Sequence, residues 1–279
     1  MEKGTPSPED LVTLRIRDQI AIITINNGKK LGALRPQDSY RICCLLHDIA
    51  AMPQITVTVL TGTGRFYSAG GDTSTHRPGG STSHEIRGQI LHGFFINEIE
   101  VARAFYMHPK ILVAALNGPA VGLHAGLLGF ADFIYATPHT FLLTPFSSLG
   151  LVAEGGSSIS FVHRLGLPLA TEALLMSRKI TSERLLKSGF ITKIFSGQDE
   201  HDSDGFLTQV LKEVEDKLTG DHVNQEGLLK IKELIRRPFI DAWEAQGLRE
   251  AERGMQRLIE GAPQIEFKKI VSGGKRHKL

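Results

Sequence analysis

The sequence predicts an α/β fold with a helical extension at its C-terminal end. In the first half, β-branched runs that end in turn residues alternate with helical patterns, and from Leu169 onward the apolar spacing is helical throughout. The chain has 279 residues, of which 41% are hydrophobic, so it can bury a large core without a metal ion or a disulfide. We therefore expect a mixed core followed by a helical region.

The first elements define the α/β pattern. Strands are expected at residues 19–26 and 55–60, and the segment between them is helical in pattern, with Pro36 acceptable near its first turn. Residues 73–84 have the composition of a loop, and residues 85–107 carry apolar side chains at helical intervals. The other expected elements are strands at 111–116, 132–136 and 140–143, and helices at 122–130, 170–177, 182–188, 205–218, 226–236 and 240–259.

Composition excludes several classes of protein. The formal net charge is only +2, which gives no field that favours a nucleic acid or a membrane surface as partner. The two cysteines, Cys43 and Cys44, are adjacent and poorly placed for a structural disulfide, and no metal-binding cluster is visible. No apolar run approaches the ~20 residues of a membrane span, and the first ten residues lack the apolar core of a signal peptide. We expect a soluble intracellular protein.

Two glycine-rich turns and one glutamate suggest enolate chemistry. Residues 68–72 (SAGGD) and 117–123 (NGPAVGL) each follow an apolar run, and Glu154 precedes a Gly-Gly pair. Glycines allow a ligand to approach the main chain, and a helix that begins just after such a turn directs backbone N–H groups at that ligand. Each turn taken alone could be a tight connection and nothing more. Together, two turns and a carboxylate can hold an oxyanion and move a proton.

Four ordered motifs resemble the landmarks of the enoyl-CoA hydratase/isomerase (crotonase) superfamily. They are residues 65–72 (RFYSAGGD), 117–122 (NGPAVG), 149–156 (LGLVAEGG) and 182–191 (SERLLKSGFI). The resemblance spans roughly residues 11–195. It implies a spiral of β-β-α units with a C-terminal helical trimerisation region, and an acyl-CoA thioester as substrate with no separate cofactor.

The same resemblance assigns binding residues. The amides of Gly71 and Leu123 would form the oxyanion hole, and Ala33 and Leu34 lie in a segment similar to the one whose backbone contacts CoA. Further substrate contacts are expected at Ala69, on the nucleotide side of CoA, at Gly70, which allows close approach of a ligand, and at Phe146, a wall of the carboxylate pocket.

The departures from the superfamily pattern indicate which reaction is catalysed. Hydratases carry two glutamates, whose positions fall here on Gly126 and Phe146, and neither residue can transfer a proton. Glu154 stands where fungal peroxisomal Δ3-Δ2-enoyl-CoA isomerases, which this chain resembles most, carry their single catalytic glutamate. One carboxylate can take a proton from C2 and return it at C4, so the resemblance implies such an isomerase in fatty-acid β-oxidation, with Glu154 held in an apolar pocket that raises its pKa.

Other readings stay open. Glu154 could instead be an N-cap or first-turn acid of a helix. His124 is expected to be a packing residue and Asp72 a loop cap, while Asp132, Glu98 and Glu100 are expected to be structural or solvated. Other crotonase-type acyl-CoA conversions, such as dienoyl-CoA isomerisation or a step in specialised metabolism, and a non-catalytic acyl-CoA-binding paralogue are the alternative functions.

Composition and the family resemblance together divide the chain into four parts. We expect a disordered N-terminus at 1–10, the spiral core at 11–200, a helical region at 201–265 and a basic tail at 266–279. Lysines of this tail could meet CoA phosphates, although a solvated tail explains them equally well. Its last three residues, His277-Lys278-Leu279, resemble a peroxisomal address of the Ser-Lys-Leu type. We therefore expect a peroxisomal homotrimer or hexamer that the import receptor binds through its C-terminus.

Overall fold

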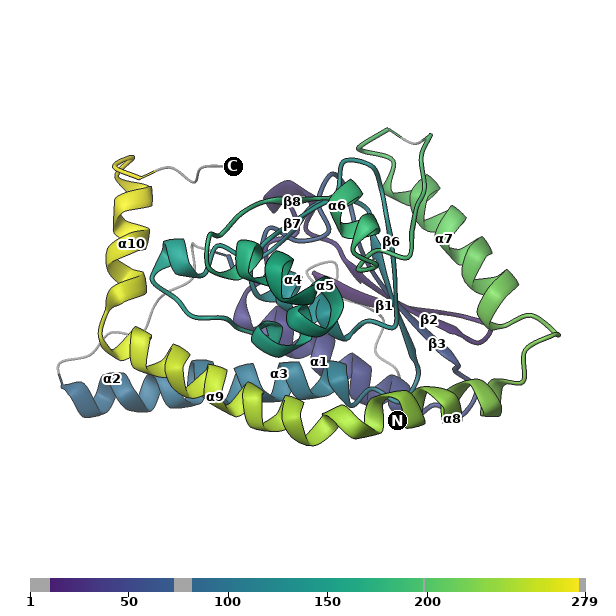
Figure 1. Ribbon diagram of the computed structural model, residues 1–279, viewed down its shortest axis with the longest axis horizontal. Helices are drawn as coiled ribbons and strands as arrows, with labels where there is room; N and C mark the ends of the chain where they lie inside the picture. The colour runs from purple at the N-terminus through teal and green to yellow at the C-terminus, as the bar shows by residue number, and fades with distance from the viewer. Residues whose placement is uncertain (1–10, 73–81, 198, 276–279) are drawn as a thin grey trace.

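A six-stranded sheet forms the centre of the computed structural model, which describes residues 11–72, 82–197 and 199–275 (Figure 1). The strand order is β1-β2-β3-β4-β6-β9. The first two strands form an antiparallel hairpin, and all other neighbours are parallel. The strands are β1 Val12–Arg17, β2 Ile20–Ile25, β3 Val57–Gly62, β4 Ile111–Leu116, β6 Phe133–Ala136 and β9 Lys193–Ile194.

Helices cover both faces of this sheet. In β2, Ile20 and Ile22 pack with the apolar side of α7 (Ser203–Leu218), while Ile23 packs on the opposite face with the cluster that contains α1 (Pro36–Ala50). Successive strand residues point to opposite faces, so burial on both faces explains why the strands read as continuous apolar runs. The predicted α/β class is confirmed.

A smaller sheet and short helices lie beside the main sheet. Its order is β5-β7-β8, with β5 parallel to β7 and β7 antiparallel to β8. The second glycine-rich turn connects β4 of the main sheet to β5 of the smaller sheet. The elements are β5 Ala120–Val121, α4 Leu123–Leu127, β7 Phe141–Leu143, α5 Ser157–Leu174, β8 Ile180–Thr181 and α6 Ser182–Lys187.

Two helical segments differ from expectation. The helix predicted at 85–107 consists of α2 (Ser83–Ile90), a π-helical segment (Leu91–Phe95) and α3 (Ile96–Tyr106) in direct succession. Helix α5 begins well before the predicted residue 170. Gly166 at φ 72° interrupts it and Pro168 follows, so only its last part has an unbroken helical pattern in the sequence.

The C-terminal helices pack along the core. Helix α9 (Ile240–Ile259) runs beside α3 and α2, and α10 (Ala262–Val271) turns away from its end (Figure 1). Helix α8 (Gln225–Arg236) precedes α9. Residues 266–271, predicted to belong to the basic tail, therefore lie in a helix. Residues 1–10, the tripeptide 277–279 and most of the loop predicted at 73–84 fall outside the described residues.

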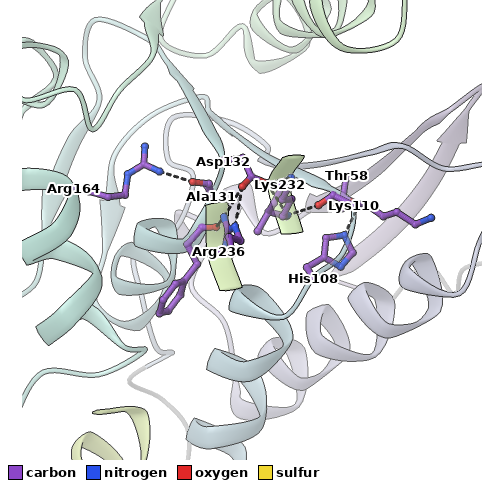
Figure 2. A network of polar contacts seen from close by, with 10 residues as sticks. Thr58, His108, Lys110, Ala131, Asp132, Arg164, Lys232 and Arg236 are labelled. Carbon is purple, nitrogen blue, oxygen red and sulfur yellow. Dashed lines mark hydrogen bonds and ion pairs between the residues drawn. The ribbon is translucent and has the colours of Figure 1, made fainter. Parts of the chain in front are cut away.

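A buried ionic cluster joins α8 to the core (Figure 2). The Oδ2 atom of Asp132 accepts from the Lys232 ammonium and from the Leu112 amide, each at 2.7 Å. The Oδ1 atom accepts from the Arg236 guanidinium at 2.6 Å. Burial alone would raise the pKa of Asp132, but the two cations lower it overall. Burial lowers the pKa of Lys232 to about 8. Asp132 is thus structural, as expected.

No helix within the described ranges is long and apolar enough to cross a bilayer.

Candidate active site

The two glycine-rich turns lie against each other. Tyr67 and Ser68 donate their backbone N–H groups to the carbonyl oxygen of Pro119 at 3.1 and 3.2 Å, and the Val121 amide donates to the carbonyl oxygen of Ser68 at 2.8 Å. These bonds continue as a parallel bridge between Ser68 and Ala120. Backbone hydrogen bonds therefore fix the position of one turn relative to the other.

Each turn leaves one backbone N–H group free. In the bridge between Leu34 and Gly71, the Leu34 amide donates to the carbonyl oxygen of Gly70, and the Asp72 amide donates to the carbonyl oxygen of Leu34. The amide of Gly71 is not used. Leu123 is the first residue of α4, so its amide has no intrahelical acceptor. Neither amide has an acceptor among the described residues. A Cβ built on Gly122 would lie 3.6 Å from the Cα of Gly70, so the two turns are in contact next to the two free amides.

A cavity of about 320 Å³ opens at these turns. Ala33 is not among its lining residues; it is half-buried, and its carbonyl oxygen accepts from the Asn27 side-chain amide at 2.6 Å. All other residues predicted for the site line the cavity: Leu34, Ala69, Gly70, Gly71, Leu123, Phe146 and Glu154.

Glu154 reaches the cavity from the turn before α5. Its side chain is 9% exposed and accepts no hydrogen bond from the described residues. The helix is capped by a different acid: Glu250, from α9, accepts from the amides of Gly156 at 2.7 Å and Ser158 at 2.8 Å. Gly155 and Gly156 both have positive φ, 66° and 72°, which a residue with a side chain rarely adopts. Glu250, and not Glu154, therefore caps this helix.

Burial controls the charge of this carboxyl group. It raises the pKa of Glu154 well above its ordinary value, and the neighbouring carboxylates of Glu98 and Glu250 raise it further. A raised pKa allows a carboxyl group to donate a proton as well as to accept one, as a general acid/base requires.

Glu98 is a further acid in the cavity, at a position that was not predicted from the sequence. It was expected to be structural or solvated, but its side chain is only 4% exposed and lines the cavity together with Glu154. A signal was present in the sequence: Glu98 lies four residues after Phe94 and four before Ala102, on the apolar stripe of the predicted helix. An acid on such a stripe must be buried or face a pocket.

The two positions of hydratase glutamates hold no acid here. Phe146 is 2% exposed and forms a wall of the cavity. Gly126 packs against the turn that carries Glu154, because a Cβ at Gly126 would lie 2.7 Å from the carbonyl oxygen of Glu154 and 3.3 Å from the Cβ of Ser157. A side chain at Gly126 would therefore displace the Glu154 turn.

Two weaker candidates have other partners. The His124 ring bonds to the Ser39 hydroxyl at 2.9 Å, and burial lowers the pKa of His124 to about 4, so it is neutral at physiological pH. Asp72 forms an ion pair with Lys30 at 2.8 Å. Both Asp72 and His124 line the cavity, yet neither resembles a free acid/base as Glu154 does.

The C-terminal helices close one side of the cavity. Leu258 of α9 and Pro263 and Phe267 of α10 are lining residues, which the sequence analysis did not identify. In α10, Glu266 pairs with Lys269 at 2.6 Å and Lys275 at 2.5 Å. Two of the lysines expected to meet CoA phosphates or solvent are therefore paired within the chain.

Cys43, His47 and Glu100 form a cluster outside the cavity, with ligand atoms within 4.8 Å of one another. Burial, together with Glu100, raises the pKa of the Cys43 thiol to about 12. A metal site needs the thiolate, so these surroundings disfavour one.

Comparisons with known proteins identify relatives of this chain. The family model for enoyl-CoA hydratase/isomerase matches residues 15–217. The chain is 49% identical over 278 residues to the Delta(3,5)-Delta(2,4)-dienoyl-CoA isomerase of Pyricularia oryzae, covering 96% of this chain and 99% of that protein. It is 28% identical to the 3,2-trans-enoyl-CoA isomerase of Saccharomyces cerevisiae, over 96% of both. The crystal structure of an enoyl-CoA hydratase/isomerase from Pseudoalteromonas atlantica T6c has the same fold, with a TM-score of 0.79 and 21% identity over 96% of this chain and 100% of that one.

Proposed function

Because this chain belongs to the enoyl-CoA hydratase/isomerase family, we propose that it is an isomerase that moves a double bond of an unsaturated acyl-CoA from the 3 to the 2 position. One observation carries the proposal. The buried Glu154 carboxyl group, which no described residue hydrogen-bonds, lines the same cavity as the free amides of Gly71 and Leu123. The site thus offers a proton carrier beside two donors for an oxyanion.

The proposed mechanism uses these groups in turn. The amides of Gly71 and Leu123 hold the thioester oxygen while the Glu154 carboxylate removes a proton from C2. The negative charge moves to that oxygen, where the two donors stabilise the dienolate. Glu154 then returns the proton at C4, and the double bond lies between C2 and C3. Gly70 and Phe146 shape the pocket around the acyl chain.

Dienoyl-CoA isomerisation is the second candidate. It is favoured by the name of the Pyricularia oryzae relative, which is 49% identical to this chain, and by the second buried acid, Glu98. Both candidates are isomerisations of unsaturated acyl-CoA on the same scaffold.

Incubation with two substrates tests the proposal. The purified protein should convert a 3-enoyl-CoA into the conjugated 2-enoyl product, followed by ultraviolet absorbance. Hydration of a 2-enoyl-CoA should be absent or far slower, because Gly126 and Phe146 provide no acid at the two positions that hold the hydratase glutamates. Hydration as fast as isomerisation would contradict the proposal, since Glu154 or Glu98 would then have to position water.

Leu123 should act through its backbone. Leu123→Ala keeps the N–H group and removes only the side chain, so isomerisation should change by less than about ten-fold, far below the ~10²–10³ lost with one oxyanion donor. Steady-state kinetics on 3-enoyl-CoA measures this, with thermal unfolding to correct for packing losses. A loss of ~10³-fold in a folded variant would show that the side chain is essential.

We further propose a peroxisomal homo-oligomer. The C-terminal His277-Lys278-Leu279 sequence and the β-oxidation chemistry support import through the peroxisomal receptor. Exposed apolar residues of α8, Ile231 (57%), Leu234 (73%) and Ile235 (64%), support an interface between copies, as trimer or hexamer.

A further inference from the structure

A buried polar pair lines the cavity and takes no part in the proposed mechanism. The Nε2 atom of His124, on α4, and the Oγ atom of Ser39, on α1, lie 2.9 Å apart and share one hydrogen bond. Both residues line the cavity, and they are only 2% and 4% exposed. Burying neutral polar groups costs free energy unless each group is hydrogen-bonded. The remaining hydrogen-bonding groups of this pair therefore indicate what the cavity binds.

The pair has more hydrogen-bonding groups than partners. Burial lowers the pKa of His124 to about 4, so the neutral ring carries one proton at physiological pH. Its Nδ1 atom is buried and has no partner among the described residues. Within the same residues, the Ser39 hydroxyl has no partner except the His124 ring.

The position of the ring proton decides which group is left over. An N–H group without an acceptor is rarer in protein interiors than an acceptor without a donor. We therefore assign the proton of His124 to Nε2, which donates to the Ser39 oxygen, and Nδ1 remains as the unpaired acceptor. The hydroxyl proton of Ser39 is then free to be donated to a ligand in the cavity.

A second neutral polar group comes from the helix that packs against α1. Asn97 lies in the first turn of α3, is half-buried and lines the cavity, and its side-chain amide has no hydrogen-bond partner in the described part of the chain. Asn97 also lines a neighbouring hollow of about 670 Å³, and Pro36 and Gly93 line both spaces. The cavity therefore continues past Asn97.

The charge of the lining residues restricts the ligand. Asp72 is paired with Lys30, and Glu98 accepts from the Gly155 amide at 2.5 Å, so these two acids have partners. The groups left over belong to neutral side chains, which suit a neutral oxygen atom and not a carboxylate or a phosphate.

We propose that Ser39, held by His124, and Asn97 bind an oxygen atom of the acyl chain, so that this enzyme isomerises unsaturated acyl-CoA thioesters whose chain carries a hydroxyl or another neutral oxygen group. This inference rests on the proposed function. Glu154 must reach C2 and C4, so the oxygen lies beyond C4. A plain hydrocarbon chain at this place would leave the Ser39 hydroxyl without an acceptor, which lowers affinity.

A series of substrates measures the preference of the purified protein. 3-Enoyl-CoA thioesters of equal length carry a hydroxyl group at successive carbons from C5 outward, and the unsubstituted chain is the reference. For one position, or two adjacent ones, kcat/KM should exceed that of the reference by about ten-fold, the worth of one typical hydrogen bond. A methyl group at the same carbon controls for size and should give no gain.

Variants connect the preference to the pair. Ser39→Ala removes the donor, so the ratio of kcat/KM between the hydroxylated and the plain substrate should fall toward one, and Asn97→Leu should lower it as well. Ser39→Thr keeps a hydroxyl group and should keep most of the preference. Thr171→Ala is the control, because this hydroxyl bonds to helix carbonyls of α5 outside the cavity, and the ratio should not change. A purely structural loss lowers both rates together and leaves the ratio as it was.

Two results would overturn the inference. One is equal kcat/KM for hydroxylated, methylated and plain chains at every position, and the other is a preference that neither Ser39→Ala nor Asn97→Leu alters in the folded protein. If the wild type isomerises the plain 3-enoyl-CoA without any preference, this inference fails and the proposed function stands. Activity on none of the substrates would refute both.

Discussion

Replacing Glu154 with glutamine should lower isomerisation of 3-enoyl-CoA by at least ~10²–10⁴-fold while acyl-CoA binding persists. Glutamine has nearly the same shape but cannot exchange a proton with C2 or C4. No described residue donates a hydrogen bond to the Glu154 side chain, so the substitution breaks no contact. Because burial and neighbouring acids disfavour the ionised form of Glu154, the variant should fold at least as well as the wild type at neutral pH. Steady-state kinetics and acyl-CoA titration measure the two effects.

An exposed acid provides the control for this substitution. Glu244 pairs with Arg103 at the surface at 3.3 Å, and Glu244→Gln should leave the kinetics unchanged. In the wild type, kcat/KM should fall as pH drops through the raised pKa of Glu154, since the base must be ionised. Near-normal turnover by a folded Glu154→Gln variant would refute the assignment of this residue.

Replacing Asp132 with asparagine should destabilise the fold by about 3–5 kcal/mol. The change removes the only acid that pairs with both Lys232 and Arg236, within the described residues, and leaves two buried cations beside each other. The side chain of Lys232 is 6% exposed and that of Arg236 is 11% exposed, so water can replace the lost partner only in part. Chemical denaturation at a fixed protein concentration measures the free energy of unfolding.

Two further variants identify the cause of this loss. Glu233→Gln breaks an exposed pair with Lys230, 3.1 Å long, and should cost less than about 1 kcal/mol. The double variant Asp132→Asn, Lys232→Met removes one stranded cation and should recover part of the stability. If Asp132→Asn lowers the free energy of unfolding no more than Glu233→Gln does, the buried cluster does not hold α8 against the core.

Local patterns were sufficient to predict most of the fold. The strand predicted at 111–116 is β4, and the α1 segment begins at Pro36, because β-branched runs and helix starts depend on nearby residues. The fold of crotonase type is confirmed by the shared fold of the Pseudoalteromonas atlantica structure. The first part of α5 was missed because Gly166 and Pro168 interrupt its pattern, and α10 because its basic residues read as a tail.

The site was less accessible than the fold to prediction from sequence. Motifs suggested Gly71, Leu123 and Glu154, because turn chemistry is local, and the structure brings them to one cavity. The position of Glu98 depends on α3 packing against the turn before α5, and that of Phe267 on α10 folding over the cavity. Such contacts join residues far apart in sequence. The apolar stripe indicates that Glu98 is buried, but no local spacing determines which turn it meets. Their roles stay predictions until the variants are measured.

The contact between Gly126 and the Glu154 turn limits how this scaffold can evolve. By family resemblance, a hydratase would need a glutamate at Gly126, but even its Cβ would lie 2.7 Å from the Glu154 carbonyl oxygen. A glutamate at position 126 would therefore displace the turn that carries Glu154. An acid at position 126 and the present position of Glu154 compete for the same space, so one substitution cannot add the first while leaving the second in place. Backbone packing thus restricts the chemistry of this scaffold as well as the supply of acids does.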